Sequence, residues 1–155
     1  MNIESIGTVN KETNGFSIHL NPEFVPGLKG LEGFSHLQIV WWAHLADNPD
    51  TRSKLVFEKL FKKGPAQTGV FATRTPSRPN PIMVSTIKIT KIDFENGFIY
   101  TPFIDAEPGT PVLDIKPYHP MERLQHCEVP EHRRHWPLWW EEAASFNWMD
   151  EITGV

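Results

Sequence analysis

Residues 34–45 have the sequence FSHLQIVWWAHL, a long apolar run with Trp41 and Trp42 near its end. Such a run is consistent with a strand buried on both faces, although periodicity alone does not separate it from a buried helix. The chain also contains 14 prolines, which break long helices because proline fixes φ and lacks an amide donor. We therefore interpret residues 34–45 as a strand in a protein of short strands and stiff loops.

Two Asn-Gly pairs predict β-hairpins on either side of this strand. Asn-Gly readily supplies the positive φ that a tight turn needs. The segments to be joined are residues 3–9 and 16–20 around Asn14-Gly15, and residues 84–94 and 98–103 around Asn96-Gly97.

Three further segments complete the expected fold. Residues 70–73 predict a short strand, residues 112–115 are a short apolar segment, and residues 137–149 predict a helix opening at Pro137. This order predicts an all-β fold, a single-sheeted β-barrel with a C-terminal helical appendage. We expect one domain over residues 1–155, with the barrel at about 3–120 and a Trp-rich tail at about 121–155.

Composition limits the class of protein. The formal net charge of −4 argues against a protein that coats nucleic acid nonspecifically, although a local basic patch is compatible with it. No apolar stretch is long enough for a membrane helix, and the N-terminus does not resemble a secretory signal. Cys127 is the single cysteine and cannot form an internal disulfide. We expect a cytoplasmic protein without membrane contact.

Residues 73–81, TRTPSRPNP, form the most unusual local feature of the sequence. The prolines stiffen the backbone that carries Arg74, Arg78 and Asn80, which lowers the ordering cost of binding an anion or a base. The alternative is that the arginines pair with surface carboxylates and the prolines brace a turn.

Residues 105–118, DAEPGTPVLDIKPY, form a second stiff segment. Its carboxylates suit a cationic sulfonium or ribose hydroxyls. The alternative is an ordinary turn in which Asp114 pairs with Lys116 or with an arginine of the first loop.

Other chemistries have weaker support. Cys127, His132 and His135 could supply three zinc ligands but not a fourth, so we assign no metal. The sequence contains no phosphate-binding glycine loop and no G-x-S-x-G motif.

Four motifs, taken in order, resemble the TsaA-like (TrmO) family. They are residues 6–9 (IGTV), 30–37 (GLEGFSHL), 69–74 with 78–82 (GVFATR, RPNPI) and 109–118 (GTPVLDIKPY). The resemblance implies a single-sheeted β-barrel that binds S-adenosylmethionine, forms a homodimer and methylates threonylcarbamoyl-adenosine beside the tRNA anticodon.

The same resemblance implies site residues. Cofactor contacts fall on Ala43, His44, Thr73, Arg74, Met83, Asp105, Ala106, Glu107 and Pro108. Substrate contacts are assigned to Arg78, Asn80, Lys116 and Tyr118. Asp114, His36 and His44 are candidates for the base, although both histidines also fit a role within a core strand.

This chain departs from the family pattern at several positions. It lacks the Pro-Arg-Gln-type loop after the first strand, has Pro108 where an Asp is common and Met83 where a Gly is common, and is expected to be a short form without the C-terminal domain. The alternatives are a non-catalytic module that binds S-adenosylmethionine or a nucleotide, a methyltransferase for a small molecule, and a dimerisation or regulatory protein that uses Trp136, Trp139 and Trp140.

Overall fold

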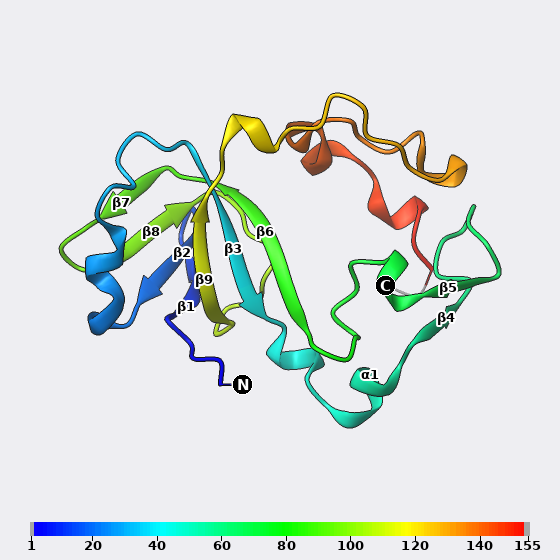
Figure 1. Ribbon diagram of the computed structural model, residues 1–155, viewed down its shortest axis with the longest axis horizontal. Coiled ribbons are helices and arrows are strands. Elements are labelled where there is room, and N and C mark those ends of the chain that lie inside the picture. Colours follow the sequence, from blue (N-terminus) through cyan, green and yellow to red (C-terminus); the bar gives the residue numbers. More distant parts are fainter. Residues whose placement is uncertain (1, 154–155) are drawn as a thin grey trace.

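The computed structural model describes residues 2–153. Its largest element is one antiparallel sheet (Figure 1). Within these residues, seven strands follow one another in the order β6-β3-β9-β1-β2-β8-β7, and β4 and β5 form a separate pair. The strands are β1 (Gly7–Glu12), β2 (Gly15–Leu20), β3 (His36–Trp42), β4 (Val56–Glu58), β5 (Gln67–Gly69), β6 (Ile82–Lys88), β7 (Lys91–Asp93), β8 (Phe98–Thr101) and β9 (Pro111–Pro117).

The helices are all short. They are α1 (Pro49–Ser53) and the 3-10 helices η1 (Pro22–Leu28), η2 (His44–Ala46), η3 (Val70–Ala72), η4 (Pro120–Glu122), η5 (Glu131–Arg133), η6 (Trp140–Ser145) and η7 (Trp148–Asp150). Within residues 2–153, none of them has the length and apolar character needed to cross a membrane.

Strand β3 confirms the strand predicted within residues 34–45, with one correction. Leu37, Ile39 and Trp41 are buried, and the residues between them are only partly covered. The strand therefore faces the core on one side only, as in an antiparallel sheet with one solvated face. The core consists mainly of aliphatic side chains from facing strands, among them Val9, Ile18, Leu37, Ile39, Ile87, Ile99 and Val112.

Both predicted hairpins are confirmed. Strands β1 and β2 pair up to Glu12 and Gly15, so Thr13 and Asn14 form the turn and Gly15 adopts a φ of 118°. Strands β7 and β8 pair around Asn96-Gly97. The preceding residues 82–88 do not extend this hairpin, because they form β6 and pair with β3.

The expected closed barrel is not confirmed. Strands β6 and β7 stand at opposite ends of the sheet order, yet only Ile89 and Thr90 lie between them in the chain. The Ile89 amide donates to the Ser35 carbonyl, and the Thr90 amide donates to the Tyr100 carbonyl, at 2.8 and 2.9 Å. Because β6 and β7 follow each other end to end, they do not lie side by side as a closing ladder. Within residues 2–153, the strand order is therefore that of an open but strongly curled sheet.

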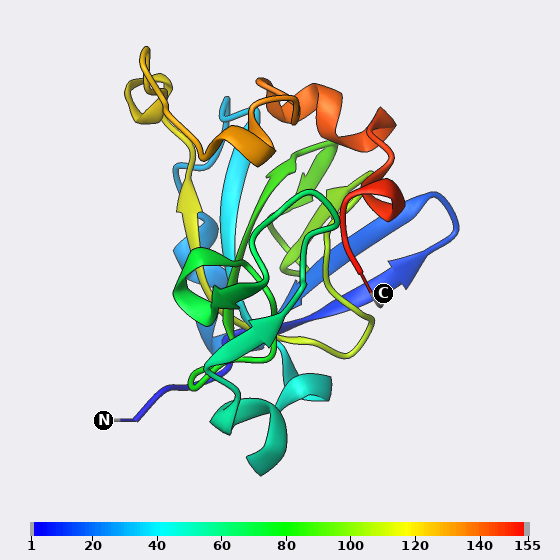
Figure 2. The same ribbon diagram turned by 90° about the vertical axis from the view of Figure 1, so that its right-hand side faces the viewer.

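Residues 55–72 leave the sheet and form a small lobe with the C-terminal tail. Phe61 pairs with Ile152, and the Lys62 amide donates to the Glu151 carbonyl at 2.9 Å. The lobe and the tail face the viewer in Figure 2. The tail therefore returns to the middle of the chain after β9.

Two local predictions were wrong. Residues 70–73 do not form a strand, because the Thr73 amide and hydroxyl both donate to the Val70 carbonyl and close the turn of η3. Residues 137–149 form no continuous helix: η6 ends before Phe146, and η7 begins at Trp148. Packing of the tail aromatics against Phe61 and one another competes with the weak intrinsic tendency of so short a segment to form a helix.

Candidate functional site

The C-terminal end of β3 lies between the starts of two other strands. Strand β3 pairs with β6 on one side and β9 on the other, both antiparallel. Trp42 is therefore opposite Ile82, and Trp41 is opposite both Met83 and Val112. As a consequence, the loop before β6 and the loop before β9 meet on either side of η2.

Two contacts join these segments. The Ala43 amide donates to the Pro81 carbonyl at 2.8 Å, which ties the start of η2 to the proline loop. On the other side, His44 Nδ1 lies 3.3 Å from Thr110 Oγ1. Ala43 and Thr110 are buried, so both joints are part of the packed structure. The two stiff segments of the sequence thus converge on the end of one strand.

The turn that carries residues 105–108 is held against β1. The Gly109 amide donates to the Val9 carbonyl at 2.8 Å, and the Val9 amide donates to the Thr110 carbonyl at 3.0 Å. Gly109 has a φ of 85°, a conformation that favours glycine. The Thr110 amide also donates to the Glu107 carbonyl at 3.1 Å, so the backbone of Glu107 is tied to the residue that contacts His44.

Arg74 reaches the free edge of β6. Its Nη2 donates to the Val84 carbonyl at 2.9 Å. Val84 is opposite Val40 on β3, and Val40 is opposite Asp114 on β9. Val84, which Arg74 contacts, therefore lies in the same row across the strands as Asp114, with Val40 between them. Lys116 Nζ lies 2.6 Å from Asp114 Oδ2, which is the pairing considered as the alternative for Asp114.

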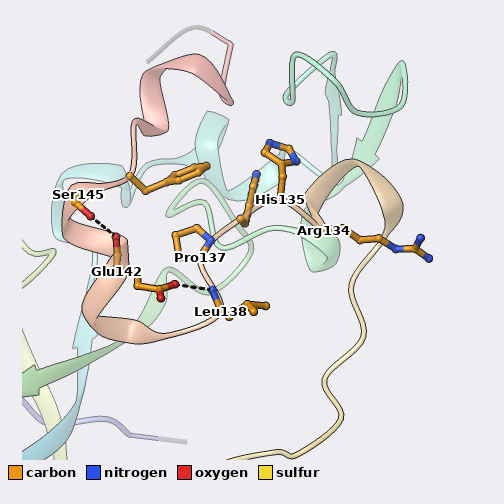
Figure 3. A pocket seen from close by; sticks show the side chains of 8 residues that line it. Arg134, His135, Pro137, Leu138, Glu142 and Ser145 are labelled. Atoms are coloured by element: carbon orange, nitrogen blue, oxygen red, sulfur yellow. Dashed lines mark hydrogen bonds between the residues drawn. The ribbon is translucent and has the colours of Figure 1, made fainter.

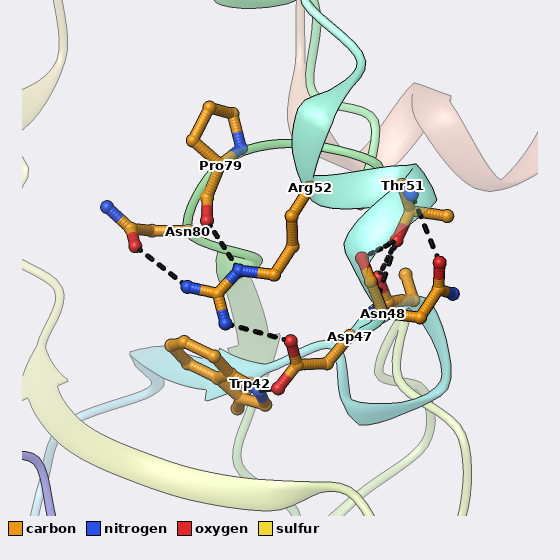
Figure 4. Close-up of polar contacts among 8 residues, drawn as sticks. Trp42, Asp47, Asn48, Thr51, Arg52, Pro79 and Asn80 are labelled. Atoms are coloured by element: carbon orange, nitrogen blue, oxygen red, sulfur yellow. Dashed lines mark hydrogen bonds and ion pairs between the residues drawn. The ribbon is translucent and has the colours of Figure 1, made fainter.

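A polar network that sequence reasoning missed braces the proline loop (Figure 4). Arg52 donates from Nε to the Pro79 carbonyl at 2.9 Å and from Nη2 to Asn80 Oδ1 at 3.4 Å. Its Nη1 lies 2.9 Å from Asp47 Oδ1. The Trp42 indole donates to the other Asp47 oxygen, and this bond, followed by Arg52, lowers the pKa of the Asp47 carboxyl below its usual value.

A sequence signal for part of this network was present. Asn48 and Thr51 form a capping box at the start of α1, with Pro49 at the first helical position. That pattern predicts the helix that carries Arg52. It does not predict which loop the guanidinium binds, because Pro79 lies 27 residues further along the chain.

Several predicted site residues lie away from the junction or are engaged in other contacts. His36 begins β3, whereas His44 follows its end, and a strand of this length separates them by roughly 20 Å. The Tyr118 amide donates to the His36 carbonyl, and Lys116 is opposite Gln38, so both residues lie at the far end of β3. Met83 packs against the hydrophobic core. Asn80 is bound to Arg52, and Arg78 is half-buried in the proline loop.

Two depressions in the surface are not lined by the predicted cofactor residues. One, of about 430 Å³, lies within the tail and is lined by residues from Arg134 to Phe146 (Figure 3). The other, of about 400 Å³, lies beside His19 and Asn96. The described residues also contain no group of three or more His, Cys, Asp or Glu side chains placed to hold a metal ion. The candidate site is therefore defined by the junction of loops at the end of β3 and not by either depression.

A family model described as the tRNA-methyltransferase O N-terminal domain matches residues 6–122. The chain belongs to this family. A probable S-adenosyl-L-methionine-binding protein of Pyrococcus horikoshii is 43% identical over 114 residues, which cover 74% of this chain and 79% of the relative. The rat tRNA (adenine(37)-N6)-methyltransferase is 44% identical over 102 residues, which cover 66% of this chain but only 22% of that enzyme.

Solved structures of the family have a similar fold. The crystal structure of TrmO from Pseudomonas aeruginosa superimposes with a TM-score of 0.61 and 26% sequence identity, covering 83% of this chain and 60% of that one. All the predicted site residues of the present chain lie inside the matched family domain. The tail after residue 122 lies outside it.

Proposed function

We propose that this protein binds S-adenosylmethionine at the end of β3 and transfers the methyl group to an adenosine of tRNA. The observation that carries the proposal is the junction in which Ala43 is bonded to Pro81 and His44 lies against Thr110. The printed names of the relatives support it, since they include a probable S-adenosyl-L-methionine-binding protein and a tRNA (adenine(37)-N6)-methyltransferase.

The residues at the junction suit this cofactor chemically. Asp105 and Glu107 provide carboxylates for ribose hydroxyls or for the positive sulfonium, and the backbone near Ala43 and Pro108 provides polar groups for the adenine edge. Thr73 and Arg74 complete the proposed set on the β6 side. When bound, S-adenosylmethionine supplies an electrophilic methyl group.

The residues of the chain have two tasks in this transfer. They must hold the acceptor nitrogen in line with the methyl group, at about 3 Å, and exclude water. They must also remove a proton, because the urea-like nitrogen of the proposed acceptor, threonylcarbamoyl-adenosine, is a weak nucleophile. Of the three candidate bases, only His44 is also one of the proposed cofactor residues. Asp114 is paired with Lys116, and His36 lies at the opposite end of β3.

The test has two steps. Titration calorimetry should detect binding of S-adenosylmethionine by the purified protein, and labelled methyl transfer should occur to tRNA that carries threonylcarbamoyl-adenosine. In addition, mass spectrometry of tRNA nucleosides from a deletion strain should show loss of the methylated form. Normal levels of that nucleoside in the deletion strain would exclude this tRNA substrate.

A second candidate is a module that binds S-adenosylmethionine without catalysis. The Pyrococcus relative, most of which this chain spans, is named for binding alone, whereas the chain spans 22% of the rat enzyme. Binding without methyl transfer to any RNA would favour this function. Transfer to a small molecule but not to tRNA would instead identify a small-molecule methyltransferase.

We also propose that the protein is a homodimer. Large apolar side chains on the segments that flank the site are exposed: Leu45, Leu55, Val56, Phe71 and Val84. A second copy would cover such a surface. Light scattering should give twice the mass of one chain, and a tRNA substrate further predicts recovery in the cytoplasmic fraction.

A further inference from the structure

The tail, residues 123–153, lies outside the matched family domain but is fastened to the lobe beside the candidate site. The Thr153 amide donates to the Leu60 carbonyl at 3.0 Å, and Lys62 Nζ donates to the Met149 carbonyl at 2.7 Å. Glu151 is buried and accepts bonds from His135 at 2.8 Å and from the Trp136 indole at 3.1 Å. The tail is thus folded on itself and anchored to residues 60–63.

Arg133 extends from this anchored tail to the segment before Arg74. Its Nη2 donates to the Ala72 carbonyl at 2.8 Å. The guanidinium lies 4.2 Å from the centre of the Phe61 ring and 5.2 Å from that of Trp136. Burial lowers the pKa of Arg133 from its usual value. Two aromatic rings and a backbone carbonyl therefore fix the position of the guanidinium.

The bonded carbonyl is the last of η3, where a helix leaves acceptors without partners of its own. Thr73 and Arg74 follow directly, and Arg74 is bonded to the edge of β6. Residues 72–74 are thus held at one end by the tail and at the other by the sheet.

We propose that Arg133 is a positioning residue for the cofactor segment Thr73-Arg74, so that the tail acts as a buttress for the site. This inference rests on the proposed binding of S-adenosylmethionine. The loss of one charge-assisted hydrogen bond predicts that Arg133→Met weakens the affinity for S-adenosylmethionine about fivefold. Arg134→Met is the matched control, because the Arg134 side chain is exposed and points away from the other labelled residues of the tail depression (Figure 3).

The experiment combines calorimetry with hydrogen exchange of the full chain. We expect Arg133→Met to weaken binding and to raise exchange in residues 70–76, with core strands unchanged and Arg134→Met equal to wild type. Unchanged affinity, with or without faster exchange, would overturn the proposal. If Arg133→Met raises exchange throughout the chain, Arg133→Lys is the deciding variant, because it keeps the charge beside Phe61 but lacks the planar guanidinium. Faster exchange confined to residues 70–76, together with weaker binding of S-adenosylmethionine, would support the proposal. Exchange and affinity equal to wild type in Arg133→Lys would refute it.

Failure of the proposed function has a different signature. If wild-type protein does not bind S-adenosylmethionine, the proposed function is wrong. Hydrogen exchange then tests the buttress separately: faster exchange in residues 70–76 of Arg133→Met supports it, and unchanged exchange overturns it.

Discussion

Arginine side chains fasten the loop before β6 by binding backbone carbonyls. Arg52 binds the carbonyl of Pro79, and Arg74 binds that of Val84. The planar guanidinium fork suits this task because one group donates in several directions at once. The two guanidinium groups differ in how many N–H donors are left to bind a ligand. Arg52 has three hydrogen-bond partners, whereas Arg74 has one among the described residues.

Arg74→Ala should abolish binding of S-adenosylmethionine with little effect on the melting temperature, because the side chain is exposed and makes a single bond. Calorimetry and thermal circular dichroism measure the two effects. Arg74→Lys, which keeps the charge without the fork, should retain part of the affinity. An affinity equal to wild type in the alanine variant would rule out the proposed role.

Arg52→Met should reduce the free energy of unfolding by about 1 kcal/mol, because it removes the hydrogen bonds to Pro79 and Asn80 from a half-exposed site. Denaturant unfolding measures this change. The control is Lys29→Met at an exposed position after η1, where a change below about 0.5 kcal/mol is expected. Equal effects of the two variants would show that the network does not stabilise the loop.

The hairpin of β1 and β2 depends on a close approach between strands. Gly15 begins β2 with a φ of 118°, and a Cβ at this position would collide with the carbonyl of Thr101 on β8. Glycine is therefore required at this position for two reasons: the positive φ disfavours other residues, and there is no room for a Cβ beside Thr101. The position of β2 between β1 and β8 depends on this residue.

Gly15→Ala should lower the free energy of unfolding by about 2 kcal/mol. Gly27→Ala is the matched control, because a Cβ at Gly27 meets no atom within 4 Å. Chemical denaturation of both variants gives the comparison. Similar stabilities would indicate that the strands shift without cost.

The whole molecule combines a curled sheet with a lobe that the tail completes. Glu151 joins the tail to the lobe, since its side chain is 6% exposed and lies 3.4 Å from Lys63 Nζ. The hydrogen bond from His135, followed by that from Trp136, lowers the pKa of Glu151 to about 2. A carboxyl whose pKa falls on folding stabilises the folded state at pH values above its unfolded pKa of 4.5.

The stabilisation by Glu151 should decline as the pH falls from 4.5 towards 2. Glu151→Gln should therefore melt well below wild type at neutral pH, and the gap should narrow across this acid range. Melting curves at several pH values measure the gap, with Glu141→Gln at an exposed position as the control. A gap that stays constant with pH would show that ionisation of Glu151 does not stabilise the tail.

Local signals in the sequence predicted the parts of the fold that depend on neighbouring residues. Asn14-Gly15 and Asn96-Gly97 marked the hairpins, and the apolar run at residues 34–45 marked β3. The family resemblance assigned cofactor contacts to both proline-rich segments, which predicted that they belong to one site. For these features, turn chemistry and hydrophobicity act within a few residues of the chain.

Long-range pairing decided the rest. The pairing of β6 with β3, and not with β8, follows from strand register, which local patterns do not report. The contact of Arg52 with Pro79 joins residues that are 27 positions apart and was likewise not predicted. The tail failed to form one helix because its tryptophans and Glu151 bind residues 60–63 and one another. Such contacts join residues tens of positions apart, and their free energy exceeds the small propensities that a local pattern reports.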